Sequence, residues 1–249
     1  MLNHPGLLSL VALLALWLTA QLGALLRRVW PLTADARDDF GVVRAACLTM
    51  LGLLIGFSFS MAITRYDLRK NYEAAEANAI GTEYLRADLL PAPSAEAVRA
   101  ELRNYLGRRI LFYQSRSEEE LRQIDADTAR LQNQMCSAVH ASASAQPLPT
   151  IALAVAGMND VLNSQGYTLA AWWNRIPVAA WALMVAMAVC CNVLVGYGQR
   201  SANASPVLLL VLPLVVAISF LLIADIDSPR TGFIHVVPQN LVSLAEGLK

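Results

Sequence analysis

The sequence is short of charge. Of its 249 residues only 15% are charged, whereas 56% are hydrophobic. An average soluble domain carries about 25% charged residues, so this composition argues against a soluble globular enzyme. Nineteen Lys and Arg balance nineteen Asp and Glu, which leaves a formal net charge of +0. Because there is no basic excess to neutralise phosphates, nucleic acid is not an expected partner.

The sequence also lacks the motifs that usually carry chemistry. It contains no GxSxG, HExxH, phosphate-binding loop or dinucleotide-binding glycine pattern. Three histidines share no ligand spacing, and four cysteines form no CxxC pair and read as small hydrophobic residues. These residues are His4, His140, His235, Cys47, Cys136, Cys190 and Cys191. We therefore expect no catalytic residue, no metal site and no cofactor.

Four uncharged apolar runs are present instead, each long enough to cross a bilayer at about 1.5 Å per helical residue. They are Gly6–Leu26, Ala45–Thr64, Ile176–Gly198 and Pro206–Ala224. The first run is longer than the apolar part of a secretory signal and has no Lys or Arg before it, which favours a retained anchor. The sequence thus predicts a polytopic membrane protein, with a kink at Pro213 in the fourth run.

A polar insert, Arg65–Arg175, separates the second and third runs and has a helical pattern. We expect the second run to continue as one helix that stops before Pro91. A helix over residues 95–139 with Ser94 as N-cap, a linker over 141–149, a helix over 150–163 and another up to Asn174 should follow.

No useful strand-like alternation appears, so the predicted fold is all-α. The predicted organisation has three parts. Residues 1–64 hold transmembrane helices 1 and 2, residues 65–175 form a helical extramembrane insert, and residues 176–249 hold transmembrane helices 3 and 4 with a short tail. Lys and Arg near the ends of the runs are too evenly divided to orient the chain in the membrane.

Acidic side chains recur at helical spacing where the second run leaves the membrane. Glu73, Glu76 and Glu83 could bind a cation or perform acid–base chemistry, or they could belong to a face laced with ion pairs. Arg69 with Glu73, and Glu83 with Arg86, have the spacing of pairs that meet on one face. The ion-pair interpretation is the simpler one.

A second acidic pair, Asp225 and Asp227, follows the fourth run at the membrane edge. With Arg230 nearby, this motif could hold Mg²⁺, but a metal–phosphate site would need more ligands and more basic groups. A helix stop followed by a turn is the simpler interpretation.

One stripe of the second run has a composition suited to a pore. Leu51, Ile55, Phe59 and Ile63 recur at steps of four residues, so in a ring of identical helices they could form a hydrophobic constriction. Gly52 and Gly56 would let neighbouring helices approach closely. Ordinary helix packing is the alternative.

Several segments resemble the bestrophin-like family of bacterial membrane proteins. The similar segments are LLIGFSFSMAITRYDLRK (53–70), EAAEANAIGTEYLRADLLP (73–91), NRIP (174–177) and LIADIDSPRTGFIHV (222–236). The motif residues are Glu76, Asn78, Gly81, Thr82, Arg86, Asp225, Asp227, Pro229, Arg230 and Gly232. The resemblance covers the four runs and the insert except residues 114–149.

The resemblance implies a fold and a function. Bestrophins are pentameric anion channels with four spans per subunit, a cytoplasmic helical part, and a pore whose apolar neck comes from the second span. It implies that Ile55 and Phe59 form the neck, and that Glu76, Asn78, Glu83 and Arg86 line a vestibule or pack subunits. A ring of Glu76 or Glu83 would favour cations. Selectivity is not carried over, and neither is calcium gating, because no convincing calcium clasp is present.

We therefore expect a homo-oligomer, a pentamer by resemblance, in a bacterial inner membrane. Its partners would be other copies of itself, lipid and small inorganic ions, with both termini and the insert in the cytoplasm. Two rivals to the ion channel stay open. One is a non-conducting scaffold or signalling protein that recruits a partner through the insert. The other is a membrane enzyme that uses the paired carboxylates.

Overall fold

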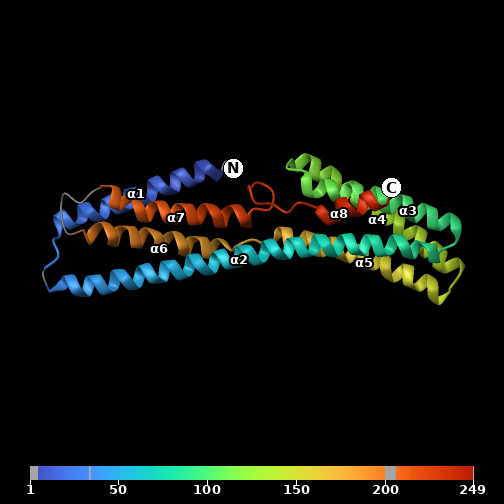
Figure 1. Ribbon diagram of the computed structural model, residues 1–249, viewed down its shortest axis with the longest axis horizontal. Coiled ribbons are helices and arrows are strands. Elements are labelled where there is room, and N and C mark those ends of the chain that lie inside the picture. The colour runs from blue at the N-terminus through green and yellow to red at the C-terminus, as the bar shows by residue number, and fades with distance from the viewer. Residues whose placement is uncertain (1–4, 34, 200–205, 249) are drawn as a thin grey trace. The chain divides into compact units, whose positions relative to one another are not determined.

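The computed structural model describes residues 5–33, 35–199 and 206–248, and they are almost entirely helical (Figure 1). The helices are α1 (Pro5–Val29), α2 (Ala36–Arg86), α3 (Ala92–Gln114), α4 (Glu118–Ala145), α5 (Pro149–Trp173), α6 (Val178–Tyr197), α7 (Pro206–Asp227) and α8 (Gln239–Gly247). A short 3₁₀ turn, Ala87–Leu89, follows α2. No strand occurs in the described residues, so the all-α prediction is confirmed.

Within the described part of the chain, four helical stretches are long and apolar enough to cross a membrane, as predicted. They lie within Ser9–Val29, Ala36–Leu89, Pro149–Tyr197 and Val207–Asp227. Since an α-helix of about 20 residues spans the hydrocarbon, only part of the long α2 is needed for its crossing. The segment of α2 that we treat as membrane-spanning is the uncharged run 45–64.

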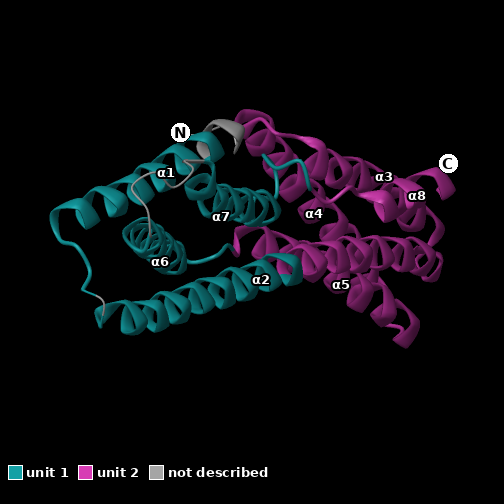
Figure 2. Ribbon diagram, turned by 60° about the vertical axis from the view of Figure 1, so that its left-hand side comes forward, with its two compact units in different colours: residues 1–64, 175–234 teal, residues 65–174, 235–249 magenta. Residues whose placement is uncertain are grey.

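The chain divides into two compact units (Figure 2). Unit 1 comprises residues 1–64 and 175–234, and unit 2 comprises residues 65–174 and 235–249. Helix α2 contributes to both units, because the boundary falls after Thr64. The second unit also takes in the C-terminal helix α8, which the sequence analysis did not anticipate.

Unit 1 is a bundle in which α1 packs against α6 and α7. Two glycines allow the close approach of α1 and α6. A Cβ added at Gly23 would lie 2.9 Å from the backbone nitrogen of Tyr197, and one at Gly196 would lie 3.0 Å from that of Ala24. Small residues at helix crossings let backbones come together in a bilayer, where the hydrophobic effect between helices is weak.

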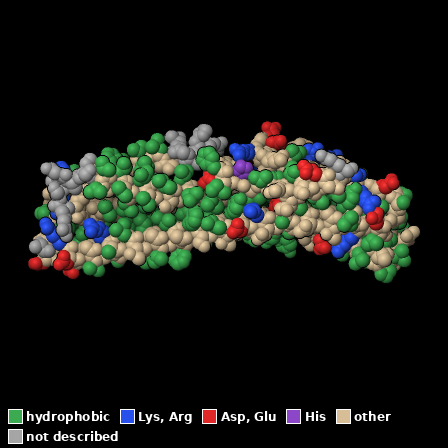
Figure 3. Space-filling view, in the orientation of Figure 1, with side chains coloured by type: hydrophobic (Ala, Val, Ile, Leu, Met, Phe, Trp, Pro, Cys, Tyr) green, Lys and Arg blue, Asp and Glu red, His purple; other side chains and the backbone are tan. Residues whose placement is uncertain are grey.

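Much of the outer surface of unit 1 is apolar. Five leucines of α1 are between 50% and 59% exposed: Leu10, Leu14, Leu18, Leu22 and Leu25. In the view of Figure 3, hydrophobic side chains cover much of the surface over α1 and α7. Such a continuous apolar surface suits a lipid environment and would be unusual in water.

Unit 2 has its own core, built from α3, α4, α5, α8 and the last part of α2. Phe112, Tyr113 and Trp172 belong to this core, and their rings contact edge to face with centroids 5.1 to 5.5 Å apart. Such aromatic contacts add about 0.5–1.5 kcal/mol per pair beyond the area they bury.

The prediction of one helix over residues 95–139 is wrong. The chain forms two helices there, α3 and α4, with a break at Ser115–Ser117. Ser117 is the N-cap of α4 and accepts a hydrogen bond from the backbone nitrogen of Glu120 at 3.4 Å. The Ser115 hydroxyl donates to the Glu120 carboxylate at 2.6 Å. Ser-x-x-Glu is a helix-start signature, and residues 117–120 carry it.

Other helix boundaries also differ from the predictions. Ser94 does not cap a helix, because α3 already begins at Ala92, directly after Pro91. Helix α4 runs to Ala145, which shortens the predicted 141–149 linker to residues 146–148. The predicted helices over 150–163 and up to Asn174 form a single helix, α5.

Candidate functional site

The membrane-spanning part of α2 has one side packed in unit 1 and one side open. Leu51 is only 2% exposed and belongs to the core that contains Met184 and Phe220. Ile55 and Phe59 are half-buried, and Ile63 is 38% exposed. The predicted stripe therefore passes gradually from the core of unit 1 to its surface.

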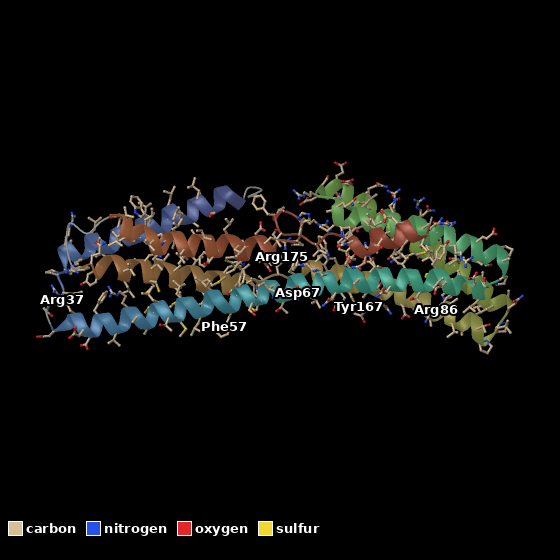
Figure 4. All side chains as sticks on the ribbon, in the orientation of Figure 1. Arg37, Phe57, Asp67, Arg86, Tyr167 and Arg175 are labelled. Carbon is tan, nitrogen blue, oxygen red and sulfur yellow. The ribbon has the colours of Figure 1, made fainter. Side chains whose placement is uncertain are left out.

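The open side of the same segment carries two kinds of residue. A Cβ added at Gly52 or Gly56 would meet nothing within 4 Å. Farther round the helix are large exposed side chains, namely Met50, Leu53, Phe57 and Met61. Figure 4 shows Phe57, the most exposed of these, on the side of α2 that faces away from α6. This uncharged, uncovered face is what α2 offers to lipid or to another subunit.

Beyond Thr64, the buried side of α2 becomes polar. Arg69 is 1% exposed and donates to the backbone oxygens of Ala171 (3.2 Å) and Asn174 (3.4 Å) at the end of α5. These carbonyls lie where a helix leaves its last acceptors without intrahelical partners. A cation also suits the negative end of the helix dipole.

Glu73, one turn farther along, performs the opposite task at the start of α8. Its carboxylate accepts from the backbone nitrogen of Leu241 at 2.9 Å and from the Asn240 side chain. Pro238, the N-cap residue of α8, makes no side-chain capping bond of its own. Glu73 therefore supplies the acceptor and the negative charge that this helix start favours.

Glu76 is the centre of a buried ion pair. Neither Glu76 nor Arg109 has any side-chain exposure, and the Arg109 guanidinium donates to both Glu76 oxygens, Nη2 to Oε2 at 3.4 Å. Thr168 (3.0 Å) and Tyr113 (3.4 Å) donate to the same carboxylate from α5 and α3. One carboxylate thus connects three helices of unit 2.

The surroundings of this pair favour the charged form of Arg109. Burial opposes the charge of Arg109, but Glu76 outweighs it and raises the pKa of Arg109 above its ordinary value. Burial, and then the charge of Glu76, raise the pKa of Tyr113, which stays a neutral donor. The Arg109 guanidinium also lies over the Phe112 ring, 4.4 Å from its centroid.

Glu83 is the third buried acid on this side of α2. It has no exposed surface and packs against Gly157 of α5. Arg86 lies against the same glycine and pairs with Asp160, Nη1 to Oδ2 at 3.7 Å. Burial raises the pKa of Glu83 from 4.5 to about 8, although Arg86 opposes this shift.

The burial of Glu76 and Glu83 does not favour an acidic ring in a vestibule, which stays a prediction. Both side chains are fully buried within this chain. Asn78 is exposed and Arg86 is half-buried, so of the four predicted vestibule or packing residues these two remain accessible. The buried acids hold helices of unit 2 together.

The Asp225 and Asp227 motif anchors backbone in unit 1. Asp225 accepts from the backbone nitrogens of Phe233 (2.7 Å) and Ile234 (2.8 Å), which closes the turn after α7. Asp227 accepts from the backbone nitrogen of Ile176 at 3.1 and 3.2 Å, just before α6. Gly232 is needed there, since a Cβ would collide with the backbone oxygen of Asp225.

This arrangement supports the helix-stop interpretation over a magnesium site. Both carboxylates are nearly buried and accept backbone N–H bonds. Arg230 lies half-buried in the same turn. Among residues 5–33, 35–199 and 206–248, no group of three metal-ligating side chains comes together.

Comparison with solved structures shows a similar fold in several of them. A variant of a bestrophin homologue from Klebsiella pneumoniae is 13% identical, with a TM-score of 0.66, covering 96% of this chain and 97% of that one. A second variant of a Klebsiella pneumoniae homologue is 14% identical with a TM-score of 0.62, at coverages of 95% and 98%. A crystal structure described only as a membrane protein is 12% identical, with a TM-score of 0.65 and coverages of 98% and 100%.

No curated protein matches the sequence. The model of one family, described as the bestrophin-like domain, matches residues 8–241, which include all four membrane-spanning segments and the whole insert. The resemblance noted in the sequence is thereby confirmed: this chain belongs to the bestrophin-like family.

Proposed function

We propose that this protein is the subunit of an oligomeric ion channel whose pore is lined by the membrane-spanning part of α2. The observation that carries the proposal is the uncharged side of α2 on which Phe59 and Ile63 lie beside Gly52 and Gly56, two glycines whose added Cβ atoms would meet nothing within 4 Å. The bestrophin fold supports the proposal, because bestrophins, as the resemblance implies, line their pore with the second span.

The position of Leu51 narrows the proposed lining to Ile55, Phe59 and Ile63. Leu51 lies in the core of its own subunit, so it packs behind the pore-lining residues and does not line the pore itself. Gly52 and Gly56 lie on the same side of the helix as Phe59 and Ile63, at about 100° per residue. In a closed ring, the pore along this side would be narrowed only by Ile55, Phe59 and Ile63. Such an apolar constriction gates by dewetting.

The proposal includes the assembly and its setting. The subunits form a closed ring, a pentamer by family resemblance, in a bacterial inner membrane. The helical insert and both termini lie in the cytoplasm, and small inorganic ions are the cargo. The enzyme alternative is weakened because Glu76, Asp225 and Asp227 all accept structural hydrogen bonds.

The matched pair Phe59 and Phe57 tests the proposal. The two residues are identical in type and two positions apart, so they project from different sides of α2, and Phe57 is 67% exposed. The measurement is single-channel recording in planar bilayers under asymmetric salt, on particles whose mass gives the subunit number. We expect Phe59→Ala to raise conductance or open time several-fold, because it widens and wets the constriction.

Phe57→Ala is the control and should conduct like the wild type. Equal effects of both substitutions would remove Phe59 from the pore wall. A particle of one subunit, or a closed ring that passes no current in any variant, would instead favour the non-conducting scaffold.

A further inference from the structure

Three glutamates on the polar side of α2 are buried, and Glu83 is the exception among them. Glu73 and Glu76 both accept hydrogen bonds from neighbouring donors. Glu83 is equally buried, at 0% exposure, yet among the described residues no donor reaches either of its carboxylate oxygens. The ionised form of a buried acid is unfavourable when no donor compensates for its lost hydration.

The Glu83 carboxyl group packs against the backbone of α5 at Gly157. A Cβ added at Gly157 would collide with Glu83 Oε2, and it would lie 2.6 Å from Arg86 Nη1. The carboxyl group therefore lies directly on the backbone of α5. The glycine creates the space that Glu83 and Arg86 fill together.

Two charged groups face Glu83, and they oppose each other. Arg86 comes from the same helix and favours the ionised carboxylate, whereas Asp160 comes from α5 and disfavours it. Arg86 is itself paired with Asp160, and the side chains of this pair are 33% and 67% exposed. Arg86, the cation that acts on Glu83, is therefore shared with another acid and partly screened by solvent.

An ionised carboxylate in this place would lose its hydration without gaining hydrogen bonds. Such a group lowers its free energy by taking up a proton. The direction of the pKa shift at Glu83 agrees with this, since burial is its largest cause.

We propose that Glu83 is a proton-binding site that holds the end of α2 against α5 while it is protonated. When the pH rises, the carboxyl O–H bond breaks, the proton passes to water, and a negative charge is left against the backbone of Gly157. That charge loosens the contact between α2 and α5 within unit 2. The proposal does not depend on whether the protein conducts ions.

The consequence for stability has a definite sign. Below pH 4.5 both the folded and the unfolded chain carry the proton. Between 4.5 and about 8 only the folded chain holds it, so stability falls as the pH rises through this window. Above the folded pKa both forms are ionised and the contribution is lost.

The test is the melting temperature of the purified full-length protein from about pH 5 to about pH 9, for the wild type and for Glu83→Gln. Gln keeps the shape of the protonated acid but cannot ionise. We expect the wild-type melting temperature to fall across this range, and the Glu83→Gln curve to be clearly flatter and to lie above it at alkaline pH. Glu73→Gln, a buried acid that has donors, should retain the wild-type slope. Parallel curves for the wild type and Glu83→Gln overturn the proposal.

A second measurement keeps the proposal testable if Glu83→Gln does not fold. Infrared difference spectroscopy detects the C=O stretch of a protonated carboxyl group directly. The wild type should show such a band at neutral pH that disappears in alkali, and Glu83→Asp should shift it. Absence of the band at neutral pH, or a band that Glu83→Asp leaves unchanged, overturns the proposal.

Discussion

The two parts of α2 place their apolar and charged side chains in opposite ways. From residue 45 to residue 64 the helix has no charge, and its outer side exposes large apolar residues such as Leu53 and Phe57. From Arg69 to Glu83 its inner side buries one arginine and three glutamates, while Asn78 and other exposed positions face outward. One continuous helix thus exposes apolar side chains along its first part and buries charged side chains along its second part.

The difference indicates where each part finds its partners. Apolar side chains in lipid gain little from leaving it, so the membrane part can leave a face open for other helices. Buried charges need partners within their own chain, because each unpaired buried charge destabilises the fold by several kcal/mol. Arg69, Glu73 and Glu76 accordingly have partners within their own chain. Assembly contacts are therefore expected on the membrane part and on exposed residues of the insert.

The largest expected effect comes from breaking the Glu76–Arg109 pair. Glu76→Ala would leave the fully buried Arg109 without its counter-charge, which should cost about 3–5 kcal/mol of the free energy of unfolding. The shift of the denaturation midpoint in detergent measures the loss. The control is Glu96→Ala, which removes an exposed acid from α3 and should change stability by less than about 0.5 kcal/mol.

A double variant sharpens this result. Glu76→Leu combined with Arg109→Met replaces both charges with apolar groups, and it should recover most of the lost stability. If Glu76→Ala is as stable as Glu96→Ala, buried ion pairing does not hold the insert together, and the contrast between the two parts of α2 is wrong.

The next largest effect is expected at Gly157. An added methyl group would collide with the ends of the Glu83 and Arg86 side chains. Because Glu83 is fully buried, its carboxyl group would have to shift inside the packed insert, and overpacking of this kind costs about 1–3 kcal/mol. Gly166→Ala is a matched control on the same helix, since a Cβ there would meet nothing within 4 Å. Alanine favours helix over glycine by about 0.5–1 kcal/mol, so the two substitutions should shift the denaturation midpoint in opposite directions. Shifts of the same sign would show that α5 does not pack closely on Glu83.

The membrane part of the fold could be predicted from the sequence because its signal is local. An uncharged apolar run of about 20 residues indicates a membrane-spanning helix. The family motifs around Glu76 and Asp225 then indicated which fold these helices form. Breaks in the insert were harder, because they depend on caps such as Ser117 rather than on hydrophobic period. Helix α8 was missed because its start is stabilised by Glu73, a residue 168 positions away from Leu241.

The roles of the candidate residues could not be predicted for the same reason. Helical spacing placed Glu73, Glu76 and Glu83 on one side of α2, but it could not show that Arg109 and Thr168 lie opposite Glu76. The spacing predicted a pair between Glu83 and Arg86. It could not show that both residues pack against Gly157 of α5, or that Arg86 pairs with Asp160 of the same helix. Long-range packing decides whether an acid faces water, a partner or neither.

The smallest effect is expected from Glu73→Gln. The amide oxygen can still accept from the Leu241 backbone nitrogen, but the negative charge at the start of α8 is lost. We expect a loss of about 0.3–1 kcal/mol, seen as faster hydrogen exchange at the backbone amides of residues 239–247 with little change elsewhere. Glu73→Ala also removes the acceptor and should raise exchange in α8 further. If neither substitution changes exchange in α8, the helix is held by its apolar contacts, such as the fully buried Leu241, and the buried charge of Glu73 has no capping role.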